Sequence, residues 1–100
     1  MKRQEAFARL QEEILREKAA VLGRAGERLE AALEEARALA HALDTDADPA
    51  RRGALLREYE TARRRVVAAR EMLIIQREAI GLRHHRDVDR QFPEPPPRRA

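Results

Sequence analysis

The strongest constraint on the fold is a row of small and apolar residues that recurs every seven positions through the first half of the chain. Because seven residues make almost two turns of an α-helix, residues with this spacing share one face and favour packing against another helix. A second row runs four residues behind the first, and no Pro interrupts residues 2–43. We therefore predict one long helix over about residues 2–43. The first row is Ala8, Leu15, Leu22, Leu29, Ala36 and Leu43, and the second is Ala19, Gly26, Leu33 and Ala40.

Two glycines lie inside this predicted helix, at positions 23 and 26. Each costs about 1 kcal/mol relative to Ala in a helix interior. They indicate either a bend near residue 24 or a place where another helix approaches closely.

The one clear interruption is the acidic segment 44–48, which Pro49 follows. Asp48 before Pro49 is typical of an N-cap and first helical position, since Asp accepts free backbone N–H groups and Pro lacks one. Asp46 is a competing N-cap. A second helix is predicted over about residues 49–86, and Gly81 is either tolerated within it or is the C′ residue that ends it. Its seam positions are Leu55, Tyr59, Ala62, Val66, Ala69, Leu73, Gln76 and Ile80.

Two helices joined by a five-residue turn pack as an antiparallel hairpin. The sequence thus predicts an all-α protein, with a helical-hairpin domain over residues 1–91 and an extended Pro-rich tail over residues 92–100. Three outcomes stay open for the tail. It packs back on its own dimer through Phe92, it is disordered, or a partner recognises its Pro-x-x-Pro-x-Arg pattern from Pro93 to Arg98.

The second predicted helix carries more apolar surface than one partner helix can cover. Val66 and Leu73 face one direction on a helical wheel, whereas Val67 and Ile74 point well away from it. A helix that is apolar on more than one side is buried on more than one side. We therefore expect two hairpins to form a homodimeric four-helix bundle with two-fold symmetry, and a different protein partner is the alternative. The expected protein interface consists of Val66, Val67, Met72, Leu73, Ile74, Ile75 and Ile80.

Residues that carry enzyme chemistry are scarce. The chain has no Cys and no Ser, which excludes disulfides, thiolate metal sites and Cys or Ser nucleophiles. A His-Glu-x-x-His signature and a Gly-rich phosphate loop are also absent. We therefore expect no enzymatic activity and no cofactor.

His84, His85, Asp87 and Asp89 form the densest group of candidate metal ligands. In a hairpin of equal arms this group would lie opposite Glu5. Adjacent His side chains point about 100° apart on a helix, so both cannot serve one ion. The group is predicted to be a solvated helix end, and we expect no metal site.

The charge distribution suggests a second kind of partner. Bases and acids number 21 and 18, for a net charge of +3, and residues 51–70 hold seven Arg against two Glu. Arg63, Arg70 and Arg77 are seven residues apart, so they form a row that could follow a phosphate backbone. Such a row more often pairs with Glu side chains of a neighbouring helix. The nucleic-acid alternative uses Arg57, Arg63, Arg64, Arg70 and Arg77.

The start of the chain has charge without an apolar h-region, and the longest apolar run is Met72 to Ile75. Both features favour a cytoplasmic protein without a secretion signal or membrane helix. The function predicted from the sequence is that of a small non-enzymatic structural or adaptor protein. It would act through helix–helix contacts with other proteins, and nucleic-acid binding by a hairpin dimer is the alternative.

Overall fold

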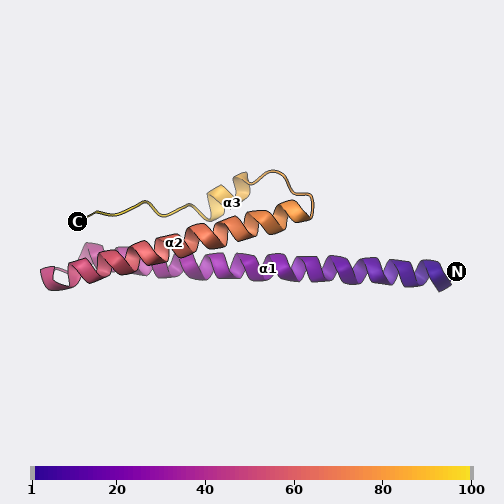
Figure 1. Cartoon of the computed structure of the whole chain (residues 1–100), viewed down its shortest axis with the longest axis horizontal. Helices are drawn as coiled ribbons and strands as arrows, with labels where there is room; N and C mark the ends of the chain where they lie inside the picture. Colours follow the sequence, from indigo (N-terminus) through magenta and orange to yellow (C-terminus); the bar gives the residue numbers. More distant parts are fainter. Residues whose placement is uncertain (1, 100) are drawn as a thin grey trace.

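The fold is a long helical hairpin with a short third helix beside it. A computed structural model describes residues 2–99, in which α1 spans Lys2–Thr45, α2 spans Pro49–Ala79 and α3 spans Arg86–Gln91. The molecule measures 72 × 20 × 15 Å, and α1 and α2 lie antiparallel along its length (Figure 1). No strand occurs among residues 2–99. The prediction of an all-helical protein with two long packed helices is confirmed.

The turn between the long helices is shorter than predicted and is capped by Asp48. Its carboxylate accepts a hydrogen bond from the backbone N–H of Ala50 at 3.0 Å, which makes Asp48 the N-cap of α2, with Pro49 after it. The carboxylate of Asp46 instead accepts the N–H of Asp48 at 2.9 Å and braces the turn. Both acids thus satisfy backbone donors that the start of a helix leaves without partners.

The seam between α1 and α2 follows the predicted seven-residue rows. The apolar residues that it buries are spaced by three, four or seven positions in each helix, as expected for a face that packs against one neighbouring helix. Leu22, Ala32, Leu39, Ala40 and Ala69 pack against its edges. The buried residues of the seam are Ala25, Leu29, Leu33, Ala36 and Leu43 from α1, and Leu55, Tyr59, Ala62, Val66 and Leu73 from α2.

The second helix ends at Ala79, and the prediction that it continues to about residue 86 is wrong. Gly81 adopts a positive φ of 94°, a conformation that costs Gly little because it has no Cβ. Its N–H donates to the carbonyl of Glu78 at 3.0 Å, and the N–H of Leu82 donates to that of Arg77 at 3.0 Å. This pair of bonds is a Schellman cap, with Gly81 at C′.

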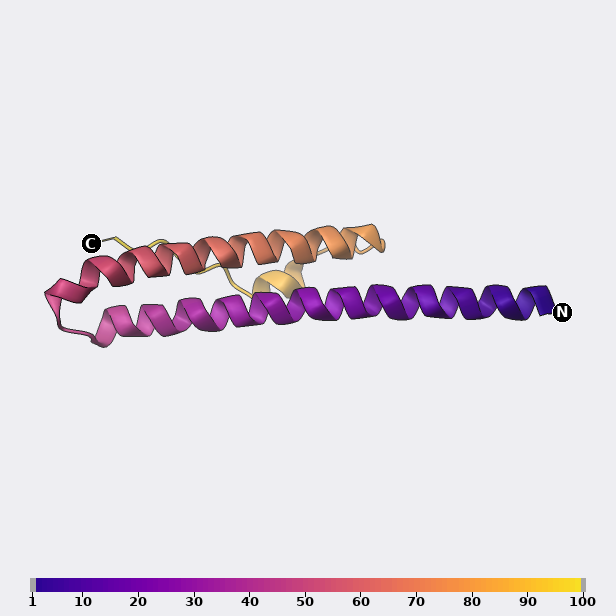
Figure 2. The ribbon, with the colours of Figure 1, turned by 60° about the horizontal axis from the view of Figure 1, so that its bottom comes forward.

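Neither glycine of α1 has the role that the sequence suggested. The helix continues through Gly23 and Gly26 without interruption, and Figures 1 and 2 show no sharp bend there. A Cβ placed on either residue would meet no atom within 4 Å, so no neighbouring helix needs their small size.

The two long helices differ in length, since α1 has 44 residues and α2 has 31. Because α2 stops at Ala79, the N-terminal part of α1 runs past its end without a neighbour (Figures 1 and 2). We call residues 2–15 the N-terminal overhang. No helix within residues 2–99 combines the length and the apolar character needed to span a bilayer.

Candidate protein interaction surfaces

The residues after Gly81 turn back and lie along the hairpin. We call residues 82–99 the C-terminal segment; it contains α3 and the prolines. In Figure 1 it runs back along α2 toward the turn end of the hairpin, and its prolines line a hollow together with residues of α1 and α2. Val88 is 2% exposed and belongs to the hydrophobic core, and Phe92 packs against the same core. Within residues 2–99 the C-terminal segment thus packs back on its own hairpin, with Phe92 among the residues in contact.

Carboxylates of α3 pair with arginines of α2. The guanidinium of Arg77 donates two hydrogen bonds to the carboxylate of Asp87, at 2.9 and 3.0 Å, and a third to the carbonyl of His84 at 3.1 Å. Two residues further along α3, Asp89 forms an ion pair with Arg70. The Arg77 guanidinium holds the pKa of the Asp87 carboxyl below its usual value. The two pairs fix α3 against α2 through charge-assisted contacts.

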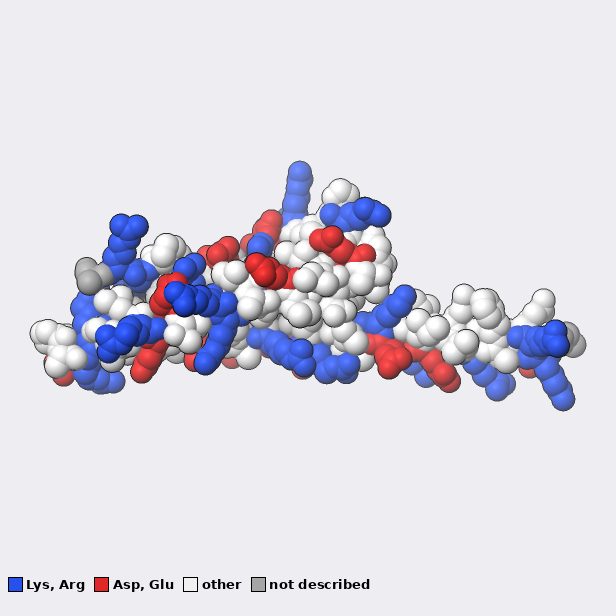
Figure 3. All heavy atoms as spheres, viewed as in Figure 1, with Lys and Arg blue, Asp and Glu red and all other residues white. Residues whose placement is uncertain are grey.

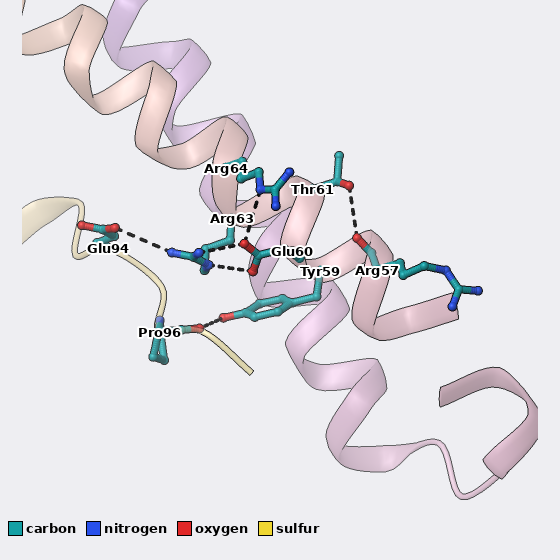
Figure 4. A network of polar contacts seen from close by, with 8 residues as sticks. All are labelled: Arg57, Tyr59, Glu60, Thr61, Arg63, Arg64, Glu94 and Pro96. Atoms are coloured by element: carbon teal, nitrogen blue, oxygen red, sulfur yellow. Dashed lines mark hydrogen bonds and ion pairs between the residues drawn. The ribbon is translucent and has the colours of Figure 1, made fainter. Parts of the chain in front are cut away.

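The third member of the arginine row, Arg63, also contacts the C-terminal segment (Figure 4). Arg63 donates to both carboxylate oxygens of Glu60, at 2.7 and 2.9 Å, and lies 3.9 Å from the carboxylate of Glu94 in the C-terminal segment. Hydrogen bonding from Arg63 lowers the pKa of Glu60, and Arg64 adds a contact at 3.4 Å. Arg63 therefore links a carboxylate of its own helix to one of the C-terminal segment.

The last residues of the C-terminal segment bind near the turn end of the hairpin. The Tyr59 hydroxyl donates to the carbonyl oxygen of Pro96 at 2.6 Å, and the Arg98 guanidinium lies 6.0 Å from the centre of the Tyr59 ring. Arg98 also forms an ion pair with Asp44 and thereby lowers the pKa of that carboxyl. A hollow of about 270 Å³ between the prolines and the hairpin has Leu33 in its lining.

These contacts change the interpretation of the arginine row. The side chains of Arg63 and Arg70 are each 22% exposed and that of Arg77 is 17% exposed, because carboxylates cover them. Arg64 is 78% exposed, and Arg57 is also exposed. A free row of three arginines for phosphate therefore does not exist in this conformation.

The expected pairing of this row with Glu side chains of the first helix is also wrong. Between the long helices the ion pair found is that of Arg65 with Glu35, at 3.2 Å. The partners of Arg77 and Arg70 come from α3, because the chain reverses at Gly81. In the sequence these partners are visible only as the acids at positions 87, 89 and 94. They can be assigned to the arginines only once the end of α2 is known.

The metal group considered in the sequence is not assembled. The reversal at Gly81 carries His84 and His85 back along α2 and away from Glu5, which lies in the N-terminal overhang (Figure 1). His85 Nε2 lies 3.4 Å from a carboxylate oxygen of Glu78. Within residues 2–99, no three His, Cys, Asp or Glu side chains gather where they could share an ion.

The predicted protein interface divides into three groups. Val66 and Leu73 are buried in the seam, so they stabilise the hairpin and are not open to a partner. Val67 and Ile74 are half-buried. The exposed members are Met72, Ile75 and Ile80.

A second exposed apolar group lies on the N-terminal overhang, where the sequence predicted a seam. The side chains there are Phe7 at 62% exposure, Leu10 and Ile14 at about half, and Leu15 at 66%. Uncharged side chains interrupt the charged ones along this part of the molecule (Figure 3). The sequence could not identify this group as unpartnered, because the length of α2 depends on the cap at Gly81.

The two exposed groups meet at a hollow beside the end of α2. The hollow is of about 280 Å³ and lies between the overhang side of α1 and the last turn of α2. Most of the surface in it is apolar. Its lining consists of Ile14, Glu17, Lys18, Val21, Gln76, Ala79 and Ile80.

Comparisons with known proteins return no match, whether to family models, to curated proteins or to solved structures.

Proposed function

We propose that this protein is a small non-enzymatic structural or adaptor protein that acts through helix–helix contacts and forms a homodimer. The observation that carries the proposal is the position of its exposed large hydrophobic residues. Within residues 2–99 all eight of them lie in residues 7–15 or 72–82, in the half of the hairpin away from the turn. Exposed apolar surface gathered in one region is typical of a protein–protein contact.

The physical argument is one of buried area. Burying a large apolar side chain contributes about 1.5–3 kcal/mol to stability. A chain of this size has a small buried core, so covering several exposed apolar side chains in a dimer adds appreciably to its stability. Val66 and Leu73 are already buried in the seam of the hairpin, and Val88 is buried where the C-terminal segment packs on it. A second helical surface is therefore the natural cover for Met72 and Ile80 on α2.

The proposal does not extend to nucleic acid. Three of the five arginines that this alternative requires are paired with carboxylates: Arg63, Arg70 and Arg77. Phosphate would have to replace these intramolecular partners before the row could bind it.

The proposal is tested by the mass in solution across a range of concentrations, from sedimentation equilibrium. The expected mass is twice that of the 11.5 kDa chain. Met72→Glu places a charge beside the hollow and should lower the mass to that of one chain. Circular dichroism should show unchanged helix content, because Met72 is exposed.

The matched control is Ala54→Glu. Residues 54 and 72 are five full helical turns apart, so both variants place a carboxylate on the same face of α2. Ala54 is exposed and lies near the turn, away from the apolar group. The proposal fails if the wild-type protein is a monomer at every concentration, or if both variants dissociate it equally.

A further inference from the structure

The N-terminal overhang has no helix packed along it, and its last residues lie beside the hollow at the end of α2. We infer that it is a pairing site for the same overhang of a second copy, in antiparallel orientation about Leu10. This inference rests on the proposed self-association and adds its geometry. Three features of the described residues carry it: an apolar stripe, a reversal of charge and the position of the hollow.

The apolar stripe is self-complementary. Phe7, Leu10 and Ile14 are spaced by three and four residues, so they lie within about 60° of one another around the helix axis. All three are exposed. When two such stripes meet in opposite directions, Phe7 lies against Ile14 of the second copy and the two Leu10 side chains meet at the centre. Spacing of this kind is typical of helices that pack in pairs.

The charge along the overhang reverses in sign about the same centre. Residues 2–9 carry three bases and one acid, whereas residues 12–17 carry three acids and one base. Antiparallel pairing brings Arg3, which lies on the stripe side of the helix, near Glu17 of the second copy. Parallel pairing with two-fold symmetry would instead place each residue beside its own copy, and Arg3 would repel its equivalent. Charge complementarity therefore favours the antiparallel orientation.

The hollow beside the end of α2 gives this pairing a second contact. Ile14 is part of the stripe and also part of the lining, next to Val21 and Ile80. A Phe7 ring that lies against Ile14 of the second copy reaches the mouth of that hollow. The apolar surface of one overhang is then covered by the second overhang and by the end of the second hairpin.

The geometry is tested by cysteine cross-linking in the full-length protein, because the chain has no cysteine of its own. A short bismaleimide linker should join Gln11→Cys chains to one another, since this position lies at the centre of the pairing. Arg3→Cys alone and Lys18→Cys alone should not cross-link, because each lies roughly 20 Å from its own copy along the axis at 1.5 Å per residue. A mixture of Arg3→Cys and Lys18→Cys chains should form the mixed dimer.

Other results separate the geometry from the self-association. Cross-linking of Arg3→Cys to itself means parallel pairing and overturns the inference. A second result also overturns the inference while the proposed function stands. In it, Met72→Glu dissociates the dimer, but Gln11→Cys chains do not cross-link and Phe7→Glu has no effect on the mass. A monomer at every concentration contradicts both.

Phe7→Glu has a matched control in Ala8→Glu. Position 8 is exposed and lies about 100° further round the helix, off the stripe. We expect the mass to fall to that of one chain for Phe7→Glu and to stay at twice that value for Ala8→Glu. Equal masses for the two variants would contradict a contact through the stripe.

Discussion

The hydroxyl of Tyr59 and the carbonyl oxygen of Pro96 are joined by a hydrogen bond of 2.6 Å, although the two residues are 37 positions apart. Tyr59 is buried in the seam of the hairpin, whereas Pro96 belongs to the last, non-helical part of the chain. The bond therefore connects the hairpin seam directly to the C-terminal segment. It makes this segment a third packed element of the fold (Figure 4).

Removing this bond should loosen the end of the C-terminal segment without melting the hairpin. In Tyr59→Phe the ring still fills its place in the seam, but the donor to Pro96 is lost. A single neutral hydrogen bond contributes about 1 kcal/mol, so we expect the free energy of unfolding to fall by about that amount. Urea denaturation followed by circular dichroism measures it. An unchanged midpoint would mean that the bond does not form in solution.

Acid should release the C-terminal segment. The pKa values of Asp44 and Asp87 lie below the ordinary value of 3.8, because Arg98 and Arg77 stabilise the charged carboxylates. A carboxyl whose pKa is lowered by folding stabilises the folded state above its ordinary pKa, and this stabilisation is lost as the pH falls through the lowered value. The segment should therefore stay bound at neutral pH and detach below about pH 4.

Tyr59 reports this release, since it is the one Tyr in a chain without Trp. Its emission should change in acid as the contact with Pro96 opens. The same change should shift toward neutral pH in Arg98→Gln, which removes the partner of Asp44. Emission that is constant from neutral pH to below pH 4 would contradict the role of these carboxylates.

The pairing of Arg77 with Asp87 should restrict the motion of α3 without affecting the seam of the hairpin. Asp87→Asn keeps the shape of the side chain but removes its charge, so the bonds from Arg77 lose their ionic character. We expect faster amide exchange at Val88 and Phe92, with unchanged exchange in the seam of the hairpin. Glu71→Gln is the control, because Glu71 is an exposed acid of α2 outside this network. Equal protection of α3 in both variants would mean that the Arg77–Asp87 pair does not hold it.

Local and periodic features of the fold could be predicted from the sequence. The seven-residue rows contain Leu29, Leu33, Ala36 and Leu43, which are four of the five buried residues of α1, because residues at this spacing share the face that packs against α2. The fifth, Ala25, lies beside the rows. Asp48 and Pro49 mark the start of α2, because capping is a property of adjacent residues.

Features that depend on the end of α2 could not be predicted. Gly81 fits a helix interior and a C′ position equally in a sequence, and the conformation at this one residue decides where the following 18 residues lie. The reversal there gives the arginine row its carboxylate partners. It also leaves Phe7 and Leu15 without a neighbouring helix.

Substitutions by Ala at two glycines should have opposite effects on stability, and they test the helix boundaries directly. Gly26 lies in a continuous helix with no atom within 4 Å of an added Cβ, so Gly26→Ala should raise the free energy of unfolding by up to about 1 kcal/mol. Gly81 has a φ of 94°, where an L side chain is strained, so Gly81→Ala should lower it by about 1 kcal/mol. Thermal denaturation of the two variants beside the wild type measures both. If Gly81→Ala were stabilising, α2 would continue through this residue, and the C-terminal segment could not reach Tyr59 by the path that the cap provides.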